Sequence, residues 1–468
     1  MRARASARAA AVGAATALLI SLFGAAGAVS ATSGTLVLTS STTLTADHHG
    51  NIVVAADDVT LDCAGHSVIG PDAPGVSGGI QVIYASGVTV RNCVVTGFIV
   101  NGIYASSAAD LRLLDNTAIG NVNHGIHVHD MAGGKYRGNR LQDNGAFGLV
   151  LTAGSDSRIE GNRASGNPWA GFALLDGTTG TTVTGNISVD NGEGYRIENS
   201  SGNVLTGNVA TRTQTGILLE RAESNVVSRN TVDETAGVAL SLAVADDNRI
   251  TANKLTGAGG DLVQLVGADG NRLEDNQVQG SAGHGVSLYE GATGNVLRGN
   301  ASNANGACGF NVVAPGNTLR DNTARSNVWC GFNVSDTTGV ALIGNSAAHN
   351  DAQGILVWRS TDVELSGNNA NSNFVGIQLL LSDDNTVSGN AAANNSADGL
   401  VVETSDANSI TGNTVNSNDQ VGIWVRFGAT DNVVQANTAR QNAAVDAFDD
   451  GAVNTLWVDN SFGTTWGF

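Results

Sequence analysis

Asparagine recurs along this chain at a nearly constant spacing, and that repeat restricts the possible folds more than any other feature. Neighbouring members of the series lie 22 to 24 residues apart. The series comprises Asn116, Asn139, Asn162, Asn186, Asn208, Asn230, Asn253, Asn276, Asn300, Asn322, Asn345, Asn368, Asn390, Asn413, Asn437 and Asn460. A period of this length is typical of solenoids, in which each repeat packs against the repeats before and after it.

Two further asparagine series accompany the first, one five residues earlier (for example Asn203) and one five residues later (for example Asn121). Short alternating segments such as Gly216-Ile217-Leu218-Leu219 lie between them. Strands this short need a neighbouring strand above and below, and parallel stacking repeats the same side chain along the stack. A buried asparagine can then bond the asparagine of the next coil, so each series predicts a hydrogen-bonded ladder.

These patterns predict an all-β fold, a single-stranded right-handed parallel β-helix of about 16 to 18 coils of about 23 residues, capped at both ends. A helical alternative is disfavoured because Asn, Gly, Thr and Val are weak helix formers. We expect a signal peptide over 1–31, a cap or irregular first coils over 32–60, the parallel β-helix over 61–442 and a C-terminal cap over 443–468.

The N-terminus has the pattern of a secretory signal peptide. Arg2, Arg4 and Arg8 precede an uncharged stretch over 9–28, and small residues offer cleavage after Ala28 or Ala31. We therefore expect a secreted, extracellular protein, the alternative being an uncleaved membrane anchor. No later stretch is apolar enough to cross a membrane.

Charge restricts the partners. Loss of the three arginines with the signal peptide would change the formal net charge from −19 to −22. Such a surface repels nucleic acid and anionic membranes. It also disfavours a strongly anionic polysaccharide, unless a cation bridges the two or the site is locally positive.

The four cysteines fall into two pairs that match the coil spacing. Cys308 and Cys330 are 22 residues apart, and Cys63 and Cys93 are 30 apart around an apparent insertion at 70–79. Stacked positions about 4.8 Å apart lie within the Cα distance of a disulfide. We expect disulfides Cys308–Cys330 and Cys63–Cys93 in an exported protein. The alternative is a stack of unoxidised thiols.

The repeat resembles that of the pectate-lyase-like right-handed parallel β-helix proteins. The runs Val59-Thr60-Leu61-Asp62-Cys63-Ala64-Gly65-His66 and Val88-Thr89-Val90-Arg91-Asn92-Cys93 are similar to the opening coils of secreted bacterial β-helix proteins. Those proteins include the family of the periplasmic copper-processing protein of nitrous oxide reductase assembly. The resemblance covers about 50–460 and implies the fold and a bacterial source more than an activity.

Three histidines lie close together in His124-Gly125-Ile126-His127-Val128-His129-Asp130. His127 and His129 share the outward face of a predicted strand, and Tyr104 occupies the equivalent position one coil earlier. In one interpretation this is an acid–base site, with His129 as base and Tyr104 and His127 assisting.

The run His127 to Asp130 resembles the Asp-Pro-His-Asp motif of the β-helical alginate epimerases. His129 and Asp130 match that motif, whereas His127 and Val128 replace its Asp and Pro. The resemblance implies a polysaccharide lyase or epimerase.

Two other interpretations of the histidines stay open. His124, His127 and His129, with Asp130 or Met131, suit copper or zinc. Alternatively, these residues are solvated polar side chains on an exposed face and carry no chemistry.

Further candidates lie on other coils. Arg196 and Glu198 occupy outward positions that suit substrate binding, and so do the aromatic residues Tyr289, Trp358 and Trp424. Exposed aromatic rings on a long face suit sugar stacking or a protein partner; the alternative is that loops cover them.

Two shorter patterns have structural explanations. Gly283-His284-Gly285 resembles the Gly-His-Gly of polygalacturonases, but it also fits the coil's own glycine preceded by a turn residue. The acidic pairs Asp57-Asp58, Asp246-Asp247 and Asp383-Asp384 suit weak Ca²⁺ binding or solvated turns.

The sequence therefore predicts a secreted bacterial β-helix that binds or processes carbohydrate, a polysaccharide or cell-surface glycan, on its elongated sheet face. The alternative is a non-enzymatic extracellular binding, structural or copper-handling protein. The repeat leaves the oligomeric state open.

Overall fold

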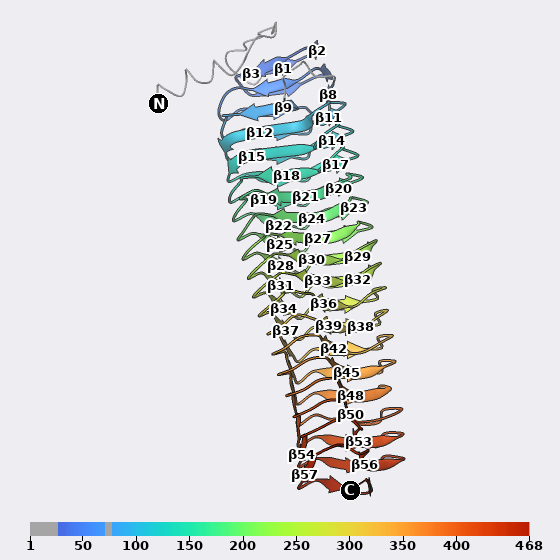
Figure 1. The fold of residues 1–468 in the computed structure, drawn as a ribbon. Coiled ribbons are helices and arrows are strands. Elements are labelled where there is room, and N and C mark those ends of the chain that lie inside the picture. The colour runs from blue at the N-terminus through green and yellow to red at the C-terminus, as the bar shows by residue number, and fades with distance from the viewer. Residues whose placement is uncertain (1–26, 71–76, 468) are drawn as a thin grey trace. The chain divides into compact units, whose positions relative to one another are not determined.

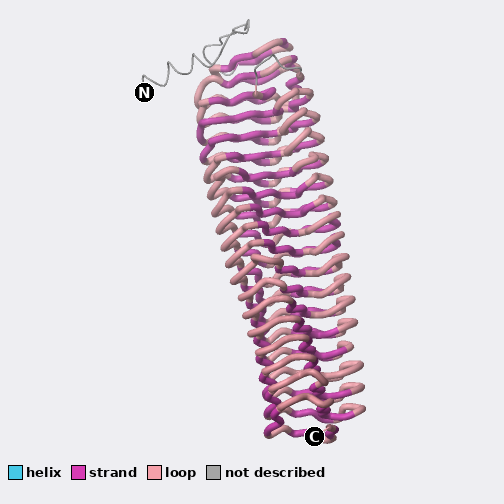
Figure 2. The backbone as a smooth tube through the Cα atoms, in the orientation of Figure 1, coloured by secondary structure: helices cyan, strands magenta, loops and turns pink. Residues whose placement is uncertain are grey.

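The computed structural model describes residues 27–70 and 77–467, and every regular element within them is a β-strand (Figure 2). The predicted signal peptide falls largely on residues 1–26, outside the described residues, and so does most of the predicted insertion at 70–79. The chain divides into two compact units, Met1–Val226 and Val227–Phe468. Each unit is described by itself.

The first unit consists of successive turns with three short strands each, and corresponding strands of successive turns form parallel sheets A, B and C (Figure 1). Sheet A contains β1 (Gly27–Val29), β4 (Thr42–Leu44), β7 (Thr60–Asp62), β10 (Thr89–Arg91), β13 (Arg112–Leu114), β16 (Lys135–Arg137), β19 (Arg158–Glu160), β22 (Thr182–Thr184) and β25 (Val204–Thr206). Sheet B contains β2 (Thr32–Ser33), β5 (His48–His49), β8 (Ser67–Ile69), β11 (Val94–Thr96), β14 (Thr117–Ile119), β17 (Arg140–Gln142), β20 (Arg163–Ser165), β23 (Ile187–Val189) and β26 (Val209–Thr211). Sheet C contains β3 (Leu36–Leu38), β6 (Ile52–Val54), β9 (Gly78–Ile83), β12 (Asn101–Ala109), β15 (Ile126–Ala132), β18 (Leu149–Thr152), β21 (Ala170–Leu175), β24 (Glu193–Glu198) and β27 (Thr215–Glu220).

The second unit repeats this arrangement. Its sheet A strands are β28 (Val226–Ser228), which begins on the last residue of the first unit, then β31 (Arg249–Thr251), β34 (Arg272–Glu274), β37 (Val296–Arg298), β40 (Thr318–Arg320), β43 (Ala341–Ile343), β46 (Glu364–Ser366), β49 (Thr386–Ser388), β51 (Ser409–Thr411), β54 (Val433–Gln435) and β57 (Leu456–Val458). Its sheet B strands are β29 (Thr231–Thr235), β32 (Lys254–Ala258), β35 (Gln277–Gln279), β38 (Ala301–Asn303), β41 (Thr323–Arg325), β44 (Ser346–Ala348), β47 (Asn369–Asn371), β52 (Thr414–Asn416), β55 (Thr438–Arg440) and β58 (Ser461–Phe462). Its sheet C strands are β30 (Leu240–Ala243), β33 (Val263–Val266), β36 (Val286–Leu288), β39 (Phe310–Val312), β42 (Phe332–Ser335), β45 (Gln353–Trp358), β48 (Val375–Leu380), β50 (Leu400–Glu403), β53 (Val421–Val425), β56 (Val445–Asp449) and β59 (Thr465–Trp466).

The strand register confirms the predicted turn length. Thr89 pairs with Arg112 and Arg112 with Lys135 in the first unit, each step being 23 residues. The first steps of the chain are irregular, since Gly27 pairs with Thr42, 15 positions later. The described residues form about 18 turns, which confirms the predicted all-β parallel solenoid. The segments expected to act as caps, 32–60 and 443–468, contain strands of the same three sheets.

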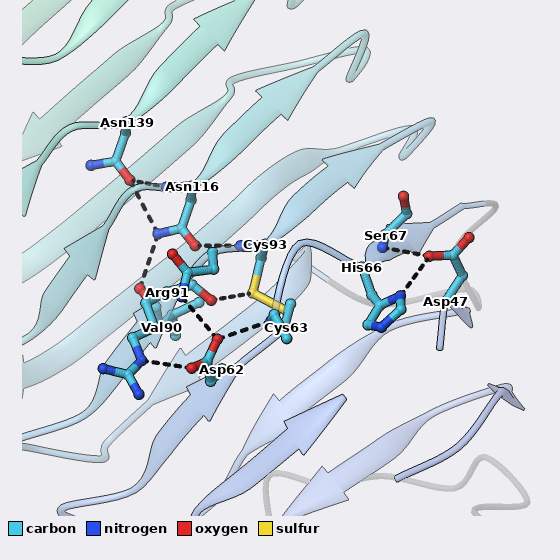
Figure 3. Close-up of a disulfide and its surroundings, with 12 residues drawn as sticks. Asp47, Asp62, Cys63, His66, Ser67, Val90, Arg91, Cys93, Asn116 and Asn139 are labelled. Atoms are coloured by element: carbon cyan, nitrogen blue, oxygen red, sulfur yellow. Dashed lines mark hydrogen bonds and ion pairs between the residues drawn. A yellow bond between two sulfur atoms is a disulfide. The ribbon is translucent and has the colours of Figure 1, made fainter. Parts of the chain in front are cut away.

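The asparagine series form the predicted ladders in the core of both units. The Nδ2 of Asn116 donates to the Oδ1 of Asn139 at 3.1 Å and to the carbonyl of Val90 at 2.9 Å, while its backbone N–H donates to the same Oδ1 at 3.0 Å (Figure 3). Asn368 bonds Asn390 in the same way. Each ladder therefore satisfies amide groups that burial would otherwise leave unpaired.

Close packing under the ladders explains the glycine that most coils share at the position of Gly125. A Cβ atom on Gly125 would lie 2.7 Å from the carbonyl oxygen of Gly148 and 2.8 Å from the Nδ2 of Asn144. Neither neighbour can retreat without breaking the stack, so the backbone requires glycine there.

Both predicted disulfides are confirmed. Cys63 and Cys93 are bonded with Cα atoms 4.7 Å apart, and Cys308 and Cys330 with Cα atoms 4.5 Å apart. The first pair lies beside the ion pair of Arg91 with Asp62, whose atoms are 2.9 Å apart (Figure 3). Each disulfide joins two adjacent turns of one unit.

Candidate functional site on sheet C of the first unit

Outward positions on sheet C form two columns in the first unit because the strands pair in parallel and in register. One column contains Tyr104, His127, Val150, Ala173 and Arg196 on successive turns. Arg196 therefore lies three turns away from His127. The structure brings Tyr104 and His127 together, but it does not bring Arg196 to them.

The second column, two residues further along each strand, contains His129, Thr152, Leu175 and Glu198. The hydroxyl of Thr152 lies 3.1 Å from the Nε2 of His127 and 2.9 Å from the Nδ1 of His129. One hydroxyl on the next turn therefore holds both imidazoles. When the Nδ1 of His129 carries the proton, its Nε2 is the nitrogen with a free lone pair.

Ring contacts extend this pair into a continuous series. The ring of His127 lies 5.4 Å from that of Tyr104 and 5.2 Å from that of His124, centroid to centroid. His124 in turn stacks on Phe147 at 5.2 Å, and Phe147 meets the edge of Trp169 at 5.1 Å. Trp169 is 59% exposed, so the series ends in an aromatic ring that is open to solvent.

The surroundings favour neutral imidazoles at two of the three histidines. Burial lowers the pKa of His124 to about 4, with a further contribution from His127. Burial also lowers the pKa of His127 to about 4, with His129 adding to the effect. The Nδ1 of His124 accepts a hydrogen bond from the backbone N–H of Phe147 at 3.3 Å. At neutral pH both rings are therefore uncharged, as a general base must be.

Asp130 lies apart from this arrangement. It is exposed, at the point where β15 turns with a φ of 50°. Within the described residues, no hydrogen bond or ion pair joins it to the three histidines. Nor do residues 27–70 and 77–467 contain a group of three or more His, Cys, Asp or Glu side chains arranged to hold a metal ion.

A groove of about 490 Å³ adjoins the ring series and shares Phe147 with it. Trp169, Leu175, Glu193 and Arg196 also line it. The groove therefore combines an aromatic wall with a charged end, and it runs across β21 and β24 beside the histidines.

Arg196 is held at this charged end by three carboxylates. Its guanidinium lies 2.8 Å from Glu193, 2.8 Å from Glu198 and 2.7 Å from Glu220. Arg221 pairs with Glu198 and Glu220 as well, each at 2.7 Å. Three carboxylates against two guanidinium groups leave a negative balance. Burial raises the pKa of Glu193 above its usual range, against the opposing effect of Arg196.

Several of these residues were missed at the level of sequence. Phe147 and Glu193 occupy the position just before the coil glycine, as His124 does, and Trp169 lies one residue earlier than that position. The pattern of outward strand positions includes only residues that follow the glycine. The aligned series His124, Phe147, Ala170 and Glu193 was the signal that would have found two of them.

The remaining candidates lie in the second unit. The hydroxyl of Tyr289 donates to Asp261 at 2.7 Å. Trp358 carries the guanidinium of Arg359 over its ring at 4.6 Å, and Trp424 carries Arg426 at 4.5 Å and stacks on Phe448 at 5.6 Å. These three aromatic residues therefore have different neighbours, and they do not form one group.

The two shorter sequence patterns have structural roles. The backbone N–H of His284 donates to the Oδ1 of Asp261 at 2.8 Å, and the N–H of Cys308 donates to the Nδ1 of His284 at 3.1 Å. His284 thus links successive turns. The first residue of each acidic pair accepts a backbone N–H from the next turn, as Asp246 does from Asp269 at 2.8 Å and Asp383 from Asp406 at 2.7 Å.

Comparison with known proteins agrees with the fold. A family described as right handed beta helix region matches overlapping stretches over 27–188, 78–232, 159–255, 187–301, 214–347 and 304–439. The chain belongs to this family of right-handed β-helix proteins. No curated protein matches the chain. Within the described residues, no helix has the length and apolar character needed to span a membrane.

Solved structures with a similar fold include enzymes. The A-module of mannuronan C-5 epimerase AlgE4 from Azotobacter vinelandii is 15% identical, and the match covers 68% of this chain and 86% of that chain with a TM-score of 0.40. The DFA-IIIase from Arthrobacter chlorophenolicus A6 is 11% identical over 55% and 83% of the two chains, with a TM-score of 0.43. The periplasmic alginate epimerase AlgG is 14% identical, and the match covers 80% of this chain and 77% of that chain with a TM-score of 0.31. At these identities the likeness concerns the fold.

Proposed function

We propose that the outward face of sheet C in the first unit binds carbohydrate in an exported bacterial protein. The observation that carries this proposal is the continuous series of rings from Tyr104 through His127, His124 and Phe147 to the exposed Trp169. The exposed ring of Trp169 suits the C–H face of a sugar, and the adjoining groove supplies polar groups for hydroxyls.

If the face is catalytic, the chemistry that fits it best is that of a polysaccharide lyase or epimerase. The Nε2 of His129 takes the proton from the sugar-ring carbon that bears the carboxylate of a uronic acid. In elimination, the hydroxyl of Tyr104 gives its proton to the leaving glycosidic oxygen as the carbon–oxygen bond breaks and a double bond forms. In epimerisation, the same hydroxyl returns a proton to the opposite face of the carbon. His127 holds Tyr104 in place through its ring contact.

A second candidate is a binding surface without chemistry, and the ion pairs of Arg196 favour it. A lyase or epimerase acts on uronic acids, whose carboxylate needs a positive partner. Arg196 already neutralises parts of three glutamates, so the charged end of the groove has a negative balance. This arrangement suits a neutral glycan better than an anionic one.

The experiment that separates these functions combines a glycan array with ultraviolet detection of unsaturated product on neutral and anionic polysaccharides. We expect binding that weakens in Trp169→Ala and Phe147→Ala. Loss of product in His129→Gln and Tyr104→Phe with binding retained would establish the catalytic role. His49→Gln, an exposed histidine on β5, serves as the matched control and should change neither.

The same variants address the metal alternative, with Ca²⁺ and Cu(II) as the cations to be tried. If the chain binds no glycan and forms no product, but takes up Cu(II) tightly and loses that uptake in His127→Ala and His129→Ala, the carbohydrate proposal is wrong. The protein would then be a copper-handling β-helix. Glycan binding that is unchanged in every variant of the ring series would also contradict the proposed face.

A further inference from the structure

A second groove lies on sheet C of the second unit, over β39, β42 and β45, and has a volume of about 370 Å³. Its lining includes Trp329 and Trp358, the amide side chains of Asn311, Asn333 and Gln353, and the Cys308–Cys330 disulfide. Volumes of about 300 to 1,000 Å³ are usual for small-molecule sites.

The amides in this groove are fixed in orientation by hydrogen bonds to other side chains. The Nδ2 of Asn333 donates to the Oδ1 of Asn311 at 2.8 Å and to the hydroxyl of Ser335 at 3.0 Å. The Nε2 of Gln353 donates to Gln378 at 2.7 Å. Among the described residues, the Nδ2 of Asn311, the Oδ1 of Asn333 and the Oε1 of Gln353 have no hydrogen-bond partner. The groove thus presents one donor group and two acceptors, already positioned.

No charged side chain of the described residues lines the groove, although the guanidinium of Arg359 lies 4.6 Å from the ring centroid of the lining residue Trp358. In the described part of the chain, no Asp, Glu, Lys or Arg is among its lining residues. Burial lowers the pKa of its one titratable residue, His284, against the opposing effect of Asp261. The Nδ1 of that ring accepts the N–H of Cys308. An uncharged lining in so acidic a chain selects for a neutral ligand, because a charged one would lose hydration without gaining a partner.

The aromatic component is unusually open. Trp329 is 62% exposed, although it borders the groove, and Trp358 is half-buried at the end of strand β45. Leaving a large indole in water has a free-energy cost that a ligand can remove by covering it. Planar amides beside an open indole are the pair of groups that bind sugar hydroxyls and sugar C–H faces together.

We propose that this second-unit groove is a binding site for an uncharged pyranose unit of a glycan, stacked on Trp329 and hydrogen-bonded to Asn311, Asn333 and Gln353. The site is complete within the second unit and does not depend on the proposed function of the first. It differs from the first-unit groove in charge, since that groove contains Glu193 and Arg196.

The test is isothermal titration of the full chain with a panel of neutral tetrasaccharides (gluco-, manno-, xylo- and galacto-configured) and with tetragalacturonate as the charged counterpart. We expect at least one neutral member to bind and tetragalacturonate not to bind. Trp329→Ala should weaken binding about ten-fold, the loss of one aromatic stack. Asn333→Asp should weaken it to a similar extent by placing a carboxylate in the groove.

Matched variants keep the two sites distinguishable. Val328→Ala removes the exposed neighbour of Trp329 and should leave binding unchanged. Trp169→Ala in the first unit should remove only the binding at that unit's face and leave the part that Trp329→Ala weakens. Circular dichroism checks that each variant folds. If Trp329→Ala does not fold, Asn333→Asp still tests the groove, because it keeps the indole of Trp329. Absence of binding across the neutral panel, equal binding of tetragalacturonate, or unchanged affinity in both groove variants would overturn the proposal. A loss in Trp169→Ala alone would assign the binding to the first-unit face.

Discussion

The two units use the same ladder and turn length, yet their outward sheet C faces differ in chemistry. The first-unit face carries histidines, aromatic rings and the ion pairs of Arg196. The equivalent positions of the second unit include Ser287, Asn311 and Asn333 on successive turns, with no charge. The ladder fixes the positions that point inward, so the outward ones are free to differ. The ladders, which the two units share, therefore account for stability, and the differing outward faces of sheet C are where we propose that ligands bind.

The largest expected effect comes from breaking a ladder, and it should be alike in both units. Asn162→Ala and Asn368→Ala each remove an acceptor of two hydrogen bonds and a buried donor. We expect a loss of about 3 kcal/mol or more in the free energy of unfolding, since buried amide groups are left unpaired. Urea unfolding with hydrogen exchange measures the loss and locates it.

The adjacent exposed residues supply the controls for this prediction. Arg163→Ala and Asn369→Ala change side chains that point into solvent one residue further along each strand. They should cost no more than about 0.5 kcal/mol. If only one of the two ladder variants lost stability, the ladders would not stabilise both units in the same way, and the prediction would be wrong.

Removing a disulfide should have the next largest effect. Cys308→Ala/Cys330→Ala removes a disulfide between residues 22 positions apart, and Cys63→Ala/Cys93→Ala removes one between residues 30 positions apart. The entropy of closing loops of these sizes predicts a loss of about 3 to 4 kcal/mol from each. Thermal unfolding with and without reductant measures it. Only the first double variant should also alter the second-unit groove, so loss of neutral sugar binding in both would count against that site.

Removing Arg196 from the first-unit groove should lower the free energy of unfolding more than removing Arg426 from the second unit. Arg196→Met leaves the partly buried Glu193 without its partner, and Glu198 and Glu220 keep only Arg221, at a cost of about 1 to 3 kcal/mol. Arg426→Met removes a single ion pair with Glu403 and should cost about 0.5 kcal/mol. Unfolding at low and high salt compares the two. Equal losses of unfolding free energy would mean that the Arg196 network stabilises the fold no more than a single ion pair does.

The smallest effect is a pH dependence specific to the first-unit face. Because burial lowers the pKa of His124 and His127 to about 4, the folded state favours the neutral rings, whereas the unfolded chain takes up protons near the ordinary histidine pKa of 6.5. The unfolded state therefore binds more protons between these values, and stability falls as the pH is lowered from 6.5 to 4.

NMR titration of the histidine ring protons measures these pKa values directly. We expect two midpoints near 4 in the folded chain and their return toward 6.5 in urea. Phe147→Ala uncovers His124 and should raise its midpoint, while His127 shifts less. Midpoints near 6.5 in the native protein would show that these rings are solvated, as the interpretation without chemistry requires.

The sequence predicted the fold because the repeat is redundant. Each asparagine series independently set the turn length, and the spacing of Cys308 and Cys330 followed from it. The Tyr104–His127 contact was predictable for the same reason, since parallel register aligns equivalent positions. The sequence did not predict that Thr152 holds both His127 and His129, because that depends on the rotamers of side chains on two turns.

The sequence by itself thus determined the turn length, the ladders, the disulfide pairing and the residues that point outward, all of which follow from one period. The tertiary structure decided which of those residues act together. It placed Phe147 and Glu193 on the first-unit face from the position just before the coil glycine, and it bound Arg196 to three glutamates. The physical reason is that a period fixes where a Cα lies, whereas charge, burial and ring contacts depend on the side chains of the neighbouring turns.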